Sequence, residues 1–181
     1  IGPNLGIIET VIALHTFFDS PRDQIIFDVS HQCYPHKMLT GRAGAYLDEA
    51  QYSGVSGFTN PEESPHDIFS IGHTSTAISL ATGLAKARDL AGRSENIIAL
   101  IGDGSLSGGE ALEGLNTAGE FKGQFLILVN DNQMSIAENH GGLYASLKAL
   151  RESNGTSENN LFRAMGLDYR YEAAGNDIGA L

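Results

Sequence analysis

The chain is poor in the residues that build disulfide-linked or membrane-embedded proteins. Its 181 residues include one cysteine, Cys33, which excludes an internal disulfide and favours a reducing compartment such as the cytoplasm. No apolar run approaches the roughly 20 residues of a transmembrane helix, and no basic and then apolar leader opens the sequence. The sequence therefore predicts a cytoplasmic protein that is not embedded in a membrane.

Basic residues are also scarce. The chain has 11 Lys and Arg residues against 22 Asp and Glu residues, which gives a net charge of -11. Nucleic acids are bound through clustered Lys and Arg, so a nucleic-acid partner is not expected. An anionic small molecule is still compatible with this charge, because helix N-termini and a bound metal supply local positive potential.

Apolar residues and glycine are abundant by contrast. The hydrophobic fraction is 41%, and 22 glycines stand against 5 prolines, as in a globular protein with many tight turns. The length suits one domain, residues 1–181. Because the sequence opens without methionine and stops within what reads as the first turn of a helix, we expect a fragment of a longer chain.

Hydrophobic spacing predicts alternating helices and strands. We expect helices at 5–18, 74–91, 108–118 and 161–165, strands at 25–29, 97–101, 125–129 and 169–171, and a loop at 53–67. Thr or Ser should cap the second helix, and Ala77, Ala81 and Gly83 would let another backbone approach it closely. Strand, helix and strand between residues 97 and 129 imply parallel pairing. The predicted fold class is α/β, a mostly parallel sheet with helices on both faces.

Polar residues follow three of these strands: Ser30-His31, Gly102-Asp103-Gly104 and Asn130-Asp131-Asn132. Ligands of open α/β sheets bind outside the carboxyl ends of the strands. Since 28 residues separate Asp103 from Asn132, about one helix and one strand, both should return to the same sheet edge. Their oxygens, a backbone carbonyl near Met134 and two diphosphate oxygens would nearly complete the octahedral shell of Mg²⁺. The alternative is structural, with Asp103 as a helix cap and Asn132 as a turn residue, and spacing alone does not decide between them.

Longer motifs carry a resemblance to known enzymes. Gly102-Asp103-Gly104 followed by Asn130-Asp131-Asn132 looks like the magnesium and diphosphate signature of thiamine-diphosphate enzymes. The run from His31 to Lys37 (HQCYPHK), with residues 5–10, 72–79 and 130–136, resembles the 1-deoxy-D-xylulose-5-phosphate synthase family. The similarity extends from about residue 5 to residue 139 and resumes near residue 161. It implies the thiamine-diphosphate-binding fold, and within it the domain that binds the diphosphate.

The resemblance also implies roles for individual residues. It assigns cofactor contacts to His31, Gly72, His73, Thr74, Gly104, Ser105 and Asn132, catalysis to His31 and His73, and magnesium binding to Asp103, Asn132 and Met134. Imidazole N–H groups can donate to phosphate oxygens, and the Gly104 and Ser105 amides open a helix. The chain departs from the family pattern at Ser30, where glycine is usual, at Asn176, where histidine is common, and in a shortened region between residues 139 and 161.

The activity that the resemblance implies is a transferase reaction. Pyruvate and D-glyceraldehyde 3-phosphate would condense with loss of CO₂, using thiamine diphosphate and Mg²⁺, to supply isoprenoid, thiamine and pyridoxal precursors. The family also implies a homodimer. The glutamate that activates the cofactor is expected on a second domain, so residues 1–181 alone are expected to be inactive. The rival interpretations are an N-terminal subunit of transketolase type and a non-catalytic remnant that binds thiamine diphosphate.

Overall fold

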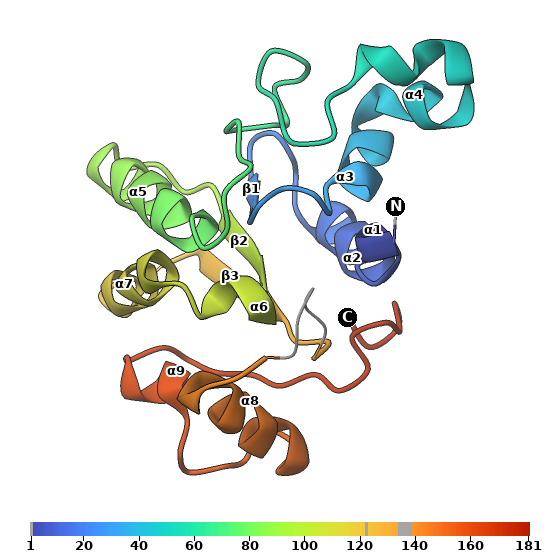
Figure 1. The fold of residues 1–181 in the computed structure, drawn as a ribbon. Coiled ribbons are helices and arrows are strands. Elements are labelled where there is room, and N and C mark those ends of the chain that lie inside the picture. Colours follow the sequence, from blue (N-terminus) through green and yellow to red (C-terminus); the bar gives the residue numbers. More distant parts are fainter. Residues whose placement is uncertain (1, 122, 134–138) are drawn as a thin grey trace.

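A parallel sheet forms the centre of the molecule. The structure is a computed structural model and describes residues 2–121, 123–133 and 139–181. Its strands β1 (Gln24–Phe27), β2 (Ile97–Gly102) and β3 (Phe125–Asn130) lie in the order β1-β2-β3, and both pairs are parallel (Figure 1). The three strands predicted from their runs of β-branched and other apolar residues are therefore confirmed.

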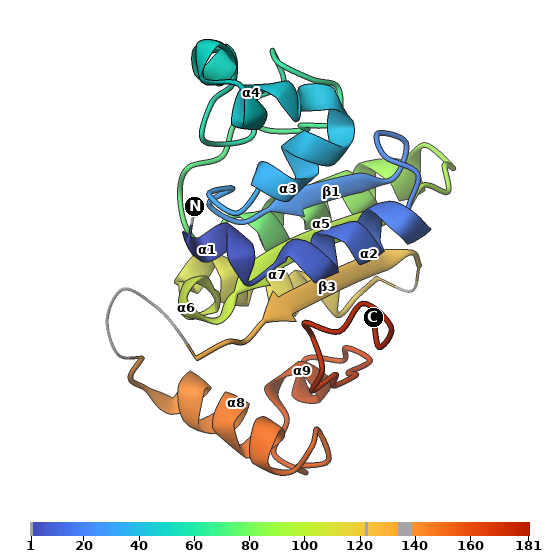
Figure 2. The same cartoon turned by 90° about the vertical axis from the view of Figure 1, so that its right-hand side faces the viewer.

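Helices cover both faces of this sheet, as predicted (Figure 1 and Figure 2). The α-helices are α1 (Gly2–Leu5), α2 (Ile8–Phe17), α3 (Tyr34–Lys37), α4 (Gly44–Leu47), α5 (Ala77–Leu90), α6 (Asp103–Leu106), α7 (Gly109–Ala118), α8 (Gly142–Glu152) and α9 (Leu161–Ala164). Of these, α1 and α2 lie on one face of the sheet, and α5 and α7 lie on the other. A π-type turn η1 (Met38–Arg42) and a 3₁₀ helix η2 (Glu49–Gly54) complete the regular elements of the described residues. No helix among these described segments is both long enough and apolar enough to cross a bilayer.

Two apolar cores lie on opposite faces of the sheet. Ile7, Val11 and Leu14 of the α1–α2 region pack with Ile25, Phe27, Ile98 and Leu100 on one face. The other core joins residues of α5 and α7 to Ile26, Ile97, Ala99 and Ile101, and also receives Leu147, Leu150 and Phe162 from α8 and α9. Because successive residues of a strand point to opposite faces, the continuous apolar runs of β1 and β2 supply both cores.

The sequence misplaced or missed several elements. The predicted helix at 5–18 corresponds to the shorter α2, preceded by a separate α1, and the helix at 74–91 begins only at Ala77. The sequence did not predict α3, α4, η1, η2 or α8. The predicted strand at 169–171 is wrong, because these residues form no ladder. Tyr169 instead stacks on Phe162 of α9, with ring centroids 5.3 Å apart and planes 3° from parallel.

A glycine does allow two helices to approach closely, but it is not Gly83. Gly83 is exposed, and a Cβ there would meet nothing within 4 Å. At Gly114 of α7 a Cβ would lie 2.9 Å from the Ser79 amide nitrogen and the Ile78 Cγ2 of α5. The small residues Ala77 and Ala81 are buried in the same core, so α5 contributes small residues to the contact as predicted.

Candidate functional site

The three polar clusters lie at one edge of the sheet. The pairing of Gly102 with Asn130 brings Asp103 and Asp131 out of adjacent strands together. On the other side of β2, Phe27 pairs with Leu100, and the Asp28 amide donates to the Leu100 carbonyl at 2.8 Å. Ser30-His31 thus follows β1 at the edge where Gly102-Asp103-Gly104 follows β2. Parallel pairing in this register explains why residues separated by about a hundred positions meet there.

Asp103 is buried near a second carboxylate, and no ion pair to it is found among the described residues. Asp103 is only 2% exposed, and its Oδ2 accepts a hydrogen bond from Asn139 Nδ2 at 3.1 Å. Burial raises the pKa of Asp103, and the negative charge of Asp131 raises it further. A group in this environment is stabilised by a nearby cation, because the cation offsets both the lost solvation and the repulsion.

Asp131 strengthens this local excess of negative charge. Its Oδ2 is paired with Arg151 of α8, whereas its buried Oδ1 has no hydrogen-bond partner among the residues that the structure describes. Native structures satisfy buried carboxylate oxygens with protein donors, water or ions. Asp103 and Asp131 thus lie near a single guanidinium, that of Arg151, and this excess of negative charge fits the environment of a divalent cation.

The chemistry of the donors at this edge suits a hard cation. Within residues 2–121, 123–133 and 139–181, no three His, Cys, Asp or Glu side chains are grouped as ligands around one point. A metal here would be held by Asp103 together with amide, backbone and ligand oxygens, which is the pattern of Mg²⁺ and unlike the nitrogen and sulfur sets of zinc. Asn132 lies exposed just beyond the end of β3, and the predicted ligand Met134 lies outside the described residues.

A cavity of about 400 Å³ opens beside Asp103. The residues that line it include Asp103, Asn139, Tyr144, Lys148 and Arg151. Lys148 and Arg151 add positive charge opposite the carboxylates, so the cavity combines features that attract a cation and an anion. These α8 residues belong to none of the motifs recognised in the sequence. Their spacing of four and three positions, which places Tyr144, Lys148 and Arg151 on one helix face, was the signal that could have found them.

The two predicted catalytic histidines are not enclosed in the core. His31 and His73 are both exposed, as are Gly72 and Thr74. Partial burial lowers the pKa of His31, and the nearby Asp28 opposes this effect. His73 Nδ1 lies 2.7 Å from the Thr74 carbonyl, which can only accept, so this nitrogen donates in the bond. Gly104 and Ser105 are half-buried in α6, directly after Asp103.

The beginning of α5 is capped from another element. No side-chain hydroxyl caps α5 at Thr76, so the expected Ser or Thr cap is wrong. The Asp28 carboxylate accepts from the Ser75 and Ala77 amides at 2.9 and 3.0 Å instead. A carboxylate is favourable at this end of a helix because the free amides point toward it. The amides of Ser75 and Ala77 are therefore already paired.

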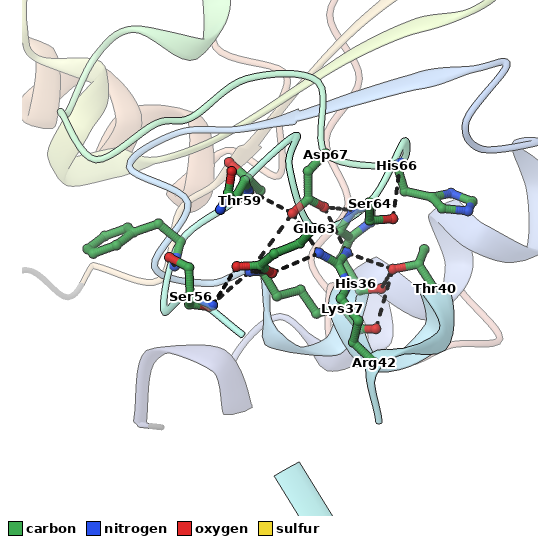
Figure 3. A network of polar contacts seen from close by, with 12 residues as sticks. His36, Lys37, Thr40, Arg42, Ser56, Thr59, Glu63, Ser64, His66 and Asp67 are labelled. Atoms are coloured by element: carbon green, nitrogen blue, oxygen red, sulfur yellow. Dashed lines mark hydrogen bonds and ion pairs between the residues drawn. The ribbon is translucent and has the colours of Figure 1, made fainter. Parts of the chain in front are cut away.

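Two residues of the HQCYPHK run, His36 and Lys37, belong to a second cluster of polar contacts (Figure 3). His36 and Lys37 are fully buried. His36 Nε2 lies 3.1 Å from Asp67 Oδ1, and Lys37 Nζ lies 2.6 Å from Glu63 Oε2. Arg42 donates to both oxygens of Asp67, at 2.7 and 2.8 Å. This ion network ties the segment after β1 to the loop at 53–67.

Comparison with known proteins identifies the family. The family model described as "1-deoxy-D-xylulose-5-phosphate synthase" matches residues 1–167. The chain belongs to this family. It is 53% identical over 151 residues to the 1-deoxy-D-xylulose-5-phosphate synthase of Halalkalibacterium halodurans and 54% identical over 151 residues to that of Geobacillus thermodenitrificans, covering 83% of this chain each time. It is also 52% identical over 143 residues, 79% of this chain, to 1-deoxy-D-xylulose-5-phosphate synthase 2 of Geobacter sulfurreducens.

These alignments cover a limited part of each relative. They include 24% of the Halalkalibacterium and Geobacillus proteins and 23% of the Geobacter protein. The chain therefore spans about a quarter of the length of the relatives it matches. The family is established by this similarity, whereas the activity of a complete protein depends also on what lies in the other three quarters of the relatives.

Proposed function

We propose that residues 1–181 form the diphosphate-binding part of a thiamine-diphosphate-dependent 1-deoxy-D-xylulose-5-phosphate synthase. The observation that carries the proposal is the pair of under-compensated carboxylates, Asp103 and Asp131, at the edge of a sheet in a chain of this family. The Mg²⁺ ion of a bound magnesium diphosphate would supply positive charge there. The complete protein would join pyruvate to D-glyceraldehyde 3-phosphate with release of CO₂, in the pathway to isoprenoids, thiamine and pyridoxal.

Each residue has a role that follows from its place. Asp103 and the Asn132 amide would hold magnesium, with a backbone carbonyl near Met134 as a further ligand. The Gly104 and Ser105 amides, at the first turn of α6, would contact the diphosphate. The exposed His31 and His73, with Gly72 and Thr74, would contact the cofactor from the other side of the strand-end edge. When bound, thiamine diphosphate supplies the electron sink for decarboxylation.

The remaining assignments concern the complete protein. We place the glutamate that activates the cofactor on a second domain, so the isolated residues 1–181 would bind without appreciable turnover. A homodimer and a cytoplasmic location complete the proposal. The family match favours this reading over a transketolase-type subunit and over a non-catalytic remnant.

Calorimetry on the full-length protein tests the cofactor assignment. Thiamine diphosphate should bind in the presence of Mg²⁺, and chelation by EDTA should remove the binding. Asp103→Ala should have the same effect as EDTA, whereas Asp168→Ala, at an exposed aspartate, should bind like the wild type. Equal affinity in Asp103→Ala would contradict the metal assignment.

Product analysis tests the reaction. The full-length protein, given Mg²⁺, thiamine diphosphate, pyruvate and D-glyceraldehyde 3-phosphate, should release CO₂ and form 1-deoxy-D-xylulose 5-phosphate. Ketol transfer without CO₂ would instead support the transketolase alternative. Cofactor binding without any product would support the non-catalytic remnant.

A further inference from the structure

Ser75 connects two segments that face the proposed cofactor. It follows His73 and Thr74, is 7% exposed, and has a left-handed backbone with φ of 72°. Its hydroxyl donates to the Ser105 carbonyl at 2.7 Å, although 30 residues separate the two positions. A residue other than glycine is disfavoured at positive φ, so the surrounding contacts must hold Ser75 in place.

The Asp28 carboxylate supplies part of that support. It is 5% exposed, lies just beyond β1, and accepts from the Ser75 amide at 2.9 Å. Its second oxygen accepts from the Ala77 amide at 3.0 Å, which fixes the first residue of α5 as well. The backbone at Ser75 and Ala77 is thus held by two amide hydrogen bonds to a carboxylate that follows a different element, β1.

Gly108 leaves the space that the Ser75 hydroxyl occupies. A Cβ at position 108 would lie 1.9 Å from Ser75 Oγ, far inside contact distance. The backbone between α6 and α7 therefore packs directly on this hydroxyl. The hydrogen bonds that Ser75 donates to Asp28 and to Ser105 therefore link three segments: the end of β1, the start of α5 and the turn after β2.

These bonds lie beside the residues expected to touch the cofactor. His73 and Thr74 immediately precede Ser75, and Gly104 immediately precedes Ser105. We propose that Ser75 is a positioning residue, whose hydroxyl holds the His73-Thr74 segment and the Gly104-Ser105 turn at the separation that a diphosphate requires. This inference rests on the proposed function. Ser75 would not itself contact substrate or cofactor. It would act on cofactor binding by holding the His73-Thr74 segment and the Gly104-Ser105 turn in place.

The substitution Ser75→Gly separates positioning from general stability. Glycine adopts positive φ without strain, so this variant loses the hydroxyl while relieving the backbone, and its unfolding midpoint in urea should stay near that of the wild type. Its Kd for thiamine diphosphate, measured by calorimetry on the full-length protein at saturating Mg²⁺, should rise about three- to tenfold, the ratio that corresponds to one net hydrogen bond.

Thr82→Val is the matched control. Thr82 is a buried residue of α5 whose hydroxyl donates to the Ile78 carbonyl at 2.6 Å, within the same helix. This variant also loses a hydroxyl-to-carbonyl bond, but that bond joins no two segments of the site. Its Kd should equal the wild-type value even if its urea midpoint falls.

The outcomes separate the two proposals. If the wild type binds thiamine diphosphate and Ser75→Gly binds it equally well, the positioning role is wrong and the proposed function stands. An equal weakening in Thr82→Val would show a general loss of order and would also overturn the positioning role. If the wild type does not bind thiamine diphosphate with Mg²⁺, the proposed function fails and this inference fails with it. Should Ser75→Gly not fold, Ser75→Ala provides the measurement, and failure of both to fold would make the role purely structural.

Discussion

Two buried carboxylates, Asp67 and Asp103, lie in opposite electrostatic environments within one chain. Burial raises the pKa of Asp67, but hydrogen bonds from Arg42 and His36 outweigh it and hold that pKa well below its ordinary value. At Asp103, burial raises the pKa, and Asp131 adds to the effect instead of opposing it. At Asp67 the protein's own groups outweigh the cost of burial, whereas at Asp103 Arg151 and backbone hydrogen bonds only partly offset burial and the charge of Asp131.

The contrast separates a structural site from a binding site by physical criteria. A buried charge that the protein has fully paired contributes to the native fold, and removing its partner or itself is costly. A buried charge that is repelled by a neighbouring charge lowers the stability of the fold. Ionisable groups with such shifted pKa values are common at ligand-binding sites. His36 and Lys37 of the HQCYPHK run thus belong to a structural site, while the Gly-Asp-Gly turn carries the proposed chemistry.

The largest effect should follow from Asp67→Asn. This change leaves the buried Arg42 and Lys37 without a full counter-charge, and unfolding free energy should fall by about 3–5 kcal/mol. Urea denaturation followed by circular dichroism measures it. Asp168→Asn, at an exposed position, should change the free energy by less than about 0.5 kcal/mol. A loss below about 1 kcal/mol at Asp67 would mean that the network is not a structural anchor.

The next effect should come from ligand binding at Asp103. Mg²⁺ with thiamine diphosphate at about 100 times the Kd should stabilise the full-length wild type by about 2.7 kcal/mol, because only the folded state binds. Asp67 should play no part in this gain. Asp103→Asn should show no gain in thermal unfolding with the same additions. A gain of wild-type size in Asp103→Asn would remove the proposed difference between the two carboxylates.

A smaller effect, of opposite sign to that at Asp67, is expected for Asp103→Asn without ligands. The folded-state pKa of Asp103 lies above its unfolded value, so the charged form destabilises the fold at neutral pH, and this penalty disappears as the pH falls through the raised pKa. Replacing the charge with an amide should leave stability unchanged or raise it by about 1 kcal/mol. A loss comparable with that of Asp67→Asn would show that Asp103 is a structural residue as well.

The sheet edge could be predicted from the sequence because short stretches of sequence indicate the type and order of successive strands and helices. The apolar runs at 25–29, 97–101 and 125–129, with a helix between the last two, were enough to imply parallel strands and to bring the residues that follow them to one edge. The pairing of Gly102 with Asn130 confirms that part. The assignment of individual cofactor contacts stays a prediction.

The parts that the sequence did not predict depend on contacts between distant segments. Thr and Ser precede α5, so local capping rules favoured them, but the Asp28 carboxylate reaches the helix from β1 and takes that place. The alternating aromatic pattern at Tyr169 and Tyr171 suggested a strand, yet stacking of Tyr169 on Phe162 provides the burial without a ladder. In the same way, nothing next to Asp67 in the sequence indicates that Arg42 and His36 surround it.

The smallest expected effect tests the outer end of the Asp67 network. His15 Nε2 lies 2.8 Å from His36 Nδ1, and His36 in turn contacts Asp67. Burial, together with the nearby His36 and His66, lowers the pKa of His15 from 6.5 to about 4. Since the unfolded state binds the proton more readily, the contribution of neutral His15 to stability is complete above pH 6.5 and is lost as the pH falls toward about 4.

The variant His15→Gln should flatten this part of the pH profile. Glutamine keeps a hydrogen-bonding group but does not titrate, so the loss of unfolding free energy between pH 6.5 and 4 should shrink by about 1 kcal/mol, the partial exposure of His15 limiting the effect. His66→Gln is the comparison, because burial also lowers the pKa of His66 while the adjacent Asp67 opposes that shift. Its flattening should therefore be weaker. An unchanged profile in both variants would mean that the histidines beside Asp67 titrate as they do in the unfolded chain, and that the compensation of Asp67 does not extend as far as α2.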